Sequence, residues 1–155
     1  MRIVGPERFT LSIEPDRCGV MCSRGKPKFS GLASGNKPKL YIASHRGMPI
    51  YVGQTVRTMG SRLRLGFKAK GKGGYYGYAW RHHLESADLD IWRHEDGPEG
   101  KARGRDMETV EAEIVFLLRQ RTGKWPQFQT EIHFYQSTNE HRQIAEQIVC
   151  HYQLT

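Results

Sequence analysis

The sequence predicts an α+β fold: a small mixed or antiparallel β-sheet of about three strands, including a hairpin that carries two tyrosines, flanked by helices. Three observations support this prediction. The length of 155 residues suits one domain with a hydrophobic core. Two short apolar runs separated by turn residues predict the hairpin. Finally, residues 107–118 repeat apolar side chains at helical spacing.

The chain divides into three predicted regions. Residues 1–38 are rich in Gly, Pro, Ser and Lys and are interpreted as an N-terminal arm, with a short candidate strand over 9–13. Residues 39–135 form the predicted core. Residues 136–155 contain a final helix, from about 139 to 151, that is expected to pack on the same domain.

The hairpin opens the core. Residues 39–43 and 49–53 are the two predicted strands, and His45-Arg46-Gly47 supplies the turn. A basic helix follows, capped by Thr55 or Thr58. A glycine- and lysine-rich loop over 68–74 comes next.

The later elements alternate in type. Aromatic residues at helical spacing occupy 76–84, and a third strand is predicted over 89–92. Asp106 stands at the N-cap position of an amphipathic helix that ends near 122–123. A short strand is expected over 130–135.

The charge is distributed very unevenly. The net charge is +8, and the stretch from Arg17 to Leu84 contains fourteen Lys or Arg and no Asp or Glu. Cations interleaved with aromatic rings are typical of surfaces that bind nucleic acid, although a solvated basic face is the simpler alternative. The predicted DNA contacts are Arg57, Arg64, Lys68, Lys70, Lys72 and Arg81.

Composition excludes other classes of protein. The mean hydropathy of −0.66 and the absence of a long apolar run argue against a membrane protein. Three cysteines make a disulfide framework improbable. We therefore expect a cytoplasmic protein with no membrane partner.

The hairpin and the helix after it carry the most informative motifs. Lys39-Leu40-Tyr41 and Tyr51-Val52-Gly53 place a tyrosine on each strand, and Arg62 lies in the following helix. With these motifs, residues 39 to about 130 resemble the GIY-YIG nuclease family. The resemblance implies an endonuclease that hydrolyses phosphodiester bonds with one Mg²⁺ or Mn²⁺.

The resemblance also implies roles for individual residues. Tyr41 and Tyr51 would position or deprotonate water, and Arg62 would neutralise the phosphate. On a helical wheel, Glu111 and Glu113 lie on opposite flanks of the apolar stripe, so periodicity does not choose between them. The family register selects Glu113 as the catalytic metal ligand.

The chain departs from the family pattern at several positions. Lys39 replaces a glycine, and Gly66 stands where many members have His or Tyr. Arg64 is a rival to Arg62, because Arg62 falls one residue later than usual. The remaining candidate catalytic residues are His82 and His83, which could serve as bases, and Gln129 or Gln127, the nearest substitutes for a family asparagine.

These observations favour a metal-dependent nuclease of duplex DNA, either restriction-like or structure-directed. A catalytically inactive nucleic-acid-binding protein with the same fold is the alternative, and RNA is the alternative substrate. A homodimer would be the natural way to cut both strands.

Overall fold

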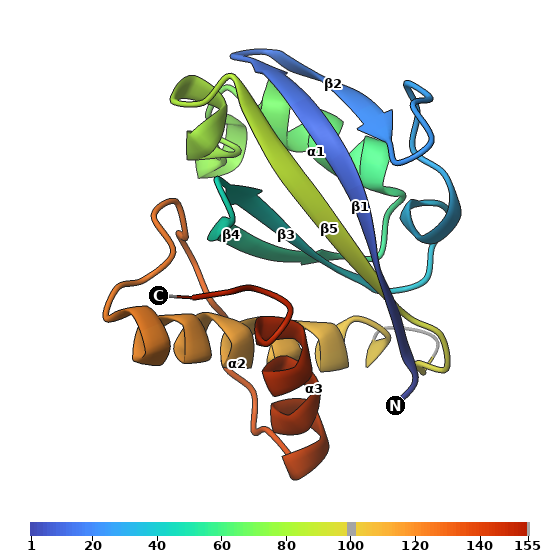
Figure 1. The fold of residues 1–155 in the computed structure, drawn as a ribbon, viewed down its shortest axis with the longest axis vertical. Helices are drawn as coiled ribbons and strands as arrows, with labels where there is room; N and C mark the ends of the chain where they lie inside the picture. Colours follow the sequence, from blue (N-terminus) through green and yellow to red (C-terminus); the bar gives the residue numbers. More distant parts are fainter. Residues whose placement is uncertain (99–101, 155) are drawn as a thin grey trace.

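A computed structural model describes residues 1–98 and 102–154. It shows an α+β fold built on a five-stranded antiparallel sheet, with strand order β2-β1-β5-β3-β4 (Figure 1). The α+β class is as predicted, but the sheet has two more strands than the expected three. The strands are β1 (Ile3–Glu14), β2 (Arg17–Cys22), β3 (Lys39–His45), β4 (Met48–Thr55) and β5 (Ser86–His94).

The extra strands come from the N-terminal region, which was predicted to be an irregular arm. β1 pairs with β2 on one side and with β5 on the other, so this region is part of the sheet. Phe9, Leu11 and Ile13 alternate along β1 and are buried. This period of two is the strand signal, and it confirms the candidate strand over 9–13. The full length of β1 and the presence of β2 were not predicted, because Gly, Pro and Ser residues interrupt the pattern on either side.

The predicted hairpin is confirmed by the pairing of β3 with β4. Tyr41 lies opposite Gly53, and Ala43 lies opposite Tyr51. Because side chains alternate across a strand, Tyr41 faces one side of the sheet while its neighbours Leu40 and Ile42 face the other.

Helices cover both faces of the sheet (Figure 1). The helix α1 (Met59–Lys68) packs on the Tyr41 face, and its N-terminal amides are capped by Thr58, one of the two residues predicted for this role. The helices α2 (Arg105–Thr122) and α3 (Asn139–Val149) pack on the opposite face, over Leu40, Ile42 and Val52. α2 ends at Gly123, whose φ of 78° is the left-handed conformation that glycine favours.

Short 3₁₀ turns complete the described structure. They are η1 (Gly31–Ala33), η2 (Lys72–Gly74) and η3 (Ala79–His82), so the expected helix over 76–84 is reduced to a single turn. Residues 130–135 form no strand. None of the described helices combines the length and the apolar character needed to cross a bilayer.

Asp106 does not cap α2. The N-cap is Gly104, and the Asp106 carboxylate instead lies 2.8 Å from Nε2 of His141 on α3. This contact ties the two helices together, which local sequence could not indicate.

Candidate nucleic-acid interface and catalytic pocket

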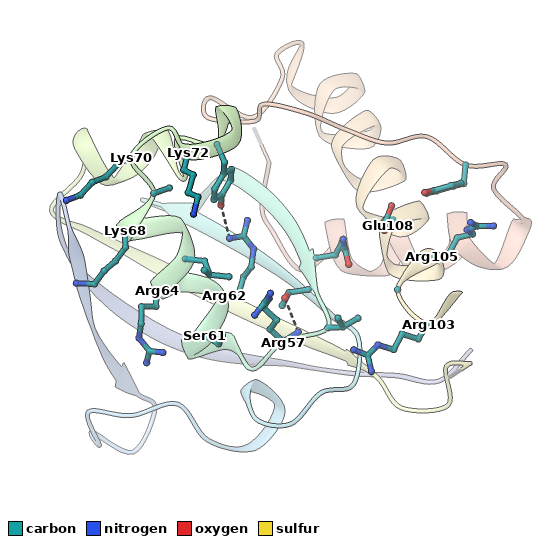
Figure 2. A pocket seen from close by; sticks show the side chains of 18 residues that line it. Arg57, Ser61, Arg62, Arg64, Lys68, Lys70, Lys72, Arg103, Arg105 and Glu108 are labelled. Carbon is teal, nitrogen blue, oxygen red and sulfur yellow. Dashed lines mark hydrogen bonds between the residues drawn. The ribbon is translucent and has the colours of Figure 1, made fainter. Parts of the chain in front are cut away.

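A large open cleft runs between α1 with its following loop and the N-terminal part of α2 (Figure 2). Its volume is about 1290 Å³. Among the described residues that line it, Glu108 is the one acid, against eight Lys and Arg side chains, so the cleft is suited to a polyanion. The basic residues are Arg57, Arg62, Arg64, Lys68, Lys70, Lys72, Arg103 and Arg105.

The two walls of the cleft differ in origin. Five of the six predicted DNA contacts lie along the α1 wall and its loop. The opposite wall carries Arg103 and Arg105, which the charge analysis did not single out because they lie in the more acidic half of the sequence. Arg105 stacks on the half-exposed ring of Tyr135, with Cζ 4.8 Å from the ring centroid.

A second, much smaller pocket of about 140 Å³ adjoins the cleft. Gln54, Arg62 and Glu108 line both spaces, so the pocket and the basic cleft are neighbours that share these side chains. The other lining residues of the pocket are Tyr51, Gly53, Glu111 and His133. An arginine, a phenol and two carboxyl groups therefore line one small pocket beside a cationic surface.

Arg62 is the best-anchored group in the pocket. Its Nη1 donates a 2.8 Å hydrogen bond to the hydroxyl of Tyr75, and its guanidinium lies 5.0 Å above the ring centroid of Tyr78. The phenols around it raise its pKa further above the ordinary range of arginine, against the opposing effect of burial. Arg64 lines only the cleft, so the geometry favours Arg62 over its rival.

Tyr41 and Tyr51 lie together, as the hairpin predicts, with ring centroids 6.0 Å apart. Tyr41 is fully buried and its hydroxyl is 2.8 Å from that of Tyr78. Burial raises the pKa of both phenols far above the usual value, and nearby Arg62 offsets only part of this effect. These hydroxyls are therefore suited to hydrogen bonding as neutral groups rather than to deprotonating water.

The two candidate glutamates are separated by the packing of α2. Glu111 lines the small pocket, where Arg62 acts on its charge, whereas Glu113 lines neither space. Residues two apart on a helix point in nearly opposite directions. The structure therefore places Glu111, and not the predicted Glu113, beside Arg62 and Tyr51.

The carboxyl group of Glu111 has a strongly raised pKa. Its burial and the neighbouring charge of Glu108 raise its pKa to about 8, although Arg62 lowers it in part. Within residues 1–98 and 102–154, no side chain or backbone amide forms a hydrogen bond or ion pair with its carboxylate. A desolvated carboxylate of this kind fits a hard divalent cation.

No preformed metal centre is present in the described part of the chain, where no three His, Cys, Asp or Glu side chains converge. Mg²⁺ is commonly held by one or two carboxylates together with water and substrate phosphate. Glu111 and Glu108, one helical turn apart at the pocket, can supply such a partial ligand set.

Several predicted site residues lie elsewhere. The guanidinium of Arg81 is buried and donates to the carbonyls of Phe67, Ala69 and Tyr76, so it shapes the basic loop and does not reach the cleft. His82 accepts a hydrogen bond from Arg81, and His83 stacks on Phe128. Neither histidine lines the cleft or the pocket.

Gln129 has a structural role. Its amide accepts a hydrogen bond from the backbone N–H of Val52 and donates one to the carbonyl of the same residue, at 2.9 and 3.0 Å. The oxygen and the nitrogen of the side-chain amide are thus both bonded to the edge strand β4.

Sequence reasoning did not find three residues that line the pocket, Gln54, Glu108 and His133. It also did not indicate that Tyr78 packs against Tyr41 and Arg62. Gln54 follows the second tyrosine motif directly, and Glu108 precedes Glu111 by one helical turn. Both could have been found from their positions next to candidate site residues. His133 lies in an irregular segment, where periodicity gives no information. Tyr78 lies in the stretch 76–84, whose helical spacing of rings gave no sign of its contact with Arg62.

Comparison with known proteins yields no relative: no protein-family model, curated protein or solved structure matches this chain.

Proposed function

We propose that this protein is a divalent-metal-dependent endonuclease of the GIY-YIG type that hydrolyses phosphodiester bonds in DNA, with duplex DNA as its substrate. The observation that carries the proposal is that Arg62, Tyr51 and Glu111 line one small pocket beside a cleft whose described lining has eight cations and one acid. The cleft would hold the phosphate backbone and deliver one phosphate to the pocket.

Each pocket residue has a role that follows from its chemistry. Arg62 would hold a non-bridging phosphate oxygen with its planar guanidinium, which its contacts with Tyr75 and Tyr78 keep in place. Tyr51 would orient the attacking water as a neutral hydrogen-bonding group. Glu111, with Glu108, would hold the cation. A bound divalent cation would supply positive charge for the phosphate and the leaving oxygen.

The binding-only alternative has its own support. Gln129 and the two predicted histidines lie outside the pocket, and Arg62 is already satisfied by Tyr75. A protein that retained the cleft but not the chemistry would bind DNA with strong salt dependence and would not cut it.

The deciding experiment incubates supercoiled plasmid with the purified protein and Mg²⁺ or Mn²⁺. We expect the wild type to nick the plasmid. The nicking rate of Glu111→Gln should be lower by about 100-fold or more, because the variant cannot supply an anionic ligand to the metal. Glu113→Gln is the matched control, with the same change two residues away. It should keep nicking within about three-fold of the wild type.

Binding is measured on the same proteins by fluorescence anisotropy with a labelled duplex and with RNA of the same sequence. Binding of the duplex without nicking under either metal supports the inactive alternative. A greater loss in Glu113→Gln than in Glu111→Gln contradicts the assignment of the acid, and tighter binding and cutting of RNA contradicts DNA as the substrate.

A further inference from the structure

Two glycines, Gly66 and Gly77, allow the segment around Tyr78 to pack against α1. A Cβ atom on Gly66 of α1 would lie 2.1 Å from Cε2 of Tyr78, and one on Gly77 would lie 1.9 Å from the carbonyl oxygen of Gly66. The backbone N–H of Tyr78 donates to that same carbonyl at 3.2 Å. The missing side chain at Gly66 therefore makes the space that the ring of Tyr78 fills.

Tyr78 then contacts the groups that surround the pocket. Its hydroxyl is 2.8 Å from the hydroxyl of Tyr41, and its ring meets that of Tyr51 edge to face at 5.3 Å. The guanidinium of Arg62 lies over its face, while Trp80 stacks against it at 4.7 Å. Tyr78 itself is only 2% exposed and does not line the pocket.

We propose that Tyr78 is a positioning residue for the cutting reaction, which fixes the guanidinium of Arg62 through its ring and the phenol of Tyr41 through its hydroxyl. This inference rests on the proposed nuclease function. Aromatic faces attract guanidinium groups, and a buried hydroxyl that loses its hydrogen-bond partner is destabilised by the desolvation that the bond had offset. Removing the hydroxyl should therefore loosen Tyr41 and, through it, Tyr51, while leaving the basic cleft intact.

The test separates chemistry from binding. Tyr78→Phe keeps the ring but loses the hydroxyl, and Gly66→Ala keeps the tyrosine but displaces its ring. Single-turnover nicking is measured with saturating protein, and the Kd for a labelled duplex is measured by anisotropy. Tyr76→Phe is the control, because Tyr76 is a 70% exposed tyrosine of the same loop.

We expect the nicking rate to fall about ten-fold in Tyr78→Phe and further in Gly66→Ala, with Kd within about two-fold of the wild type. Tyr76→Phe should cut at the wild-type rate. Thermal unfolding followed by circular dichroism shows whether each variant is folded at the assay temperature.

Two outcomes overturn the inference while the proposed function stands. One is a wild-type nicking rate in Tyr78→Phe. The other is a rate that falls only in proportion to lost binding or lost folded protein, which would make Tyr78 merely structural. If the wild type does not cut with either metal, the proposed function fails and this inference fails with it.

Discussion

Two buried cations near the cleft, Lys39 and Arg81, form no ion pair with any acid among the described residues. The ammonium group of Lys39 is fully buried and donates hydrogen bonds to the carbonyls of Gly35, Lys37 and Arg57, and burial lowers its pKa to about 8. Arg81 binds three other carbonyls in the same way. Such cations fix loop geometry, because carbonyl dipoles replace the lost hydration.

The titration of Glu111 gives a prediction at this scale. Its pKa is raised from an ordinary 4.5 to about 8 in the folded protein, so between these pH values the folded state binds more protons than the unfolded state. The free energy of unfolding should therefore fall as pH rises through this window. The Glu111→Gln substitution removes this pH-dependent loss of stability. In EDTA at pH 8, the variant should have a free energy of unfolding roughly 1–3 kcal/mol above that of the wild type.

Urea denaturation at pH 4.5 and pH 8 measures this difference. The stabilising effect of the substitution should be small at pH 4.5. Adding Mg²⁺ at pH 8 should stabilise the wild type but not the variant, since binding to the native state raises stability. Equal effects of the substitution at both pH values would show that Glu111 titrates normally.

At the scale of elements, β4 is an edge strand of the sheet next to the pocket, and the segment after α2 covers its free edge. Gln129 pairs with both backbone groups of Val52, and the N–H of Phe128 donates to the carbonyl of Ile50 at 3.0 Å. A side chain thus completes hydrogen bonds that a further strand would otherwise make.

We predict that Gln129→Ala lowers the free energy of unfolding by about 1–2 kcal/mol, because two backbone groups of β4 lose their partner. Urea denaturation measures the change. Gln127→Ala is the control, since Gln127 is exposed and makes no hydrogen bond among the described residues. A loss of nicking in Gln129→Ala beyond the loss of folded protein would instead indicate a direct catalytic role.

At the scale of the whole molecule, the cleft has basic walls from two distant parts of the chain (Figure 2). Its α1 wall comes from the acid-free half of the sequence, and Arg103 and Arg105 come from the other half. A polyanion in the cleft would contact both walls. The pocket that Arg62 and Glu111 line adjoins this cleft.

We predict that Arg103→Gln with Arg105→Gln weakens duplex binding and reduces the slope of log K against log salt by about 1–2, the value for one or two lost phosphate contacts. Anisotropy titrations at several salt concentrations measure the slope. Arg142→Gln on α3, outside the cleft, should leave it unchanged. An unaltered slope in the double variant would confine the binding surface to the α1 wall.

Local sequence was sufficient for the hairpin, a threonine-capped α1, the amphipathic body and C-terminal end of α2, and the cationic character of the site. These features depend on side-chain alternation, helical periodicity, turn residues and net charge, all of which act over a few neighbouring residues. The proximity of Tyr41, Tyr51 and Arg62 also followed, because a hairpin and the next helix are close in the chain.

Tertiary packing decided the rest. The pairing of β1 with β5 joins residues some eighty positions apart, and local composition does not encode it. Glu111 and Glu113 flank the same apolar stripe, so only the direction in which α2 lies against β4 turns one of them toward Arg62. Likewise, the charge of Arg81 was evident from its residue type, but its burial under three carbonyls depends on how the loop folds back over it.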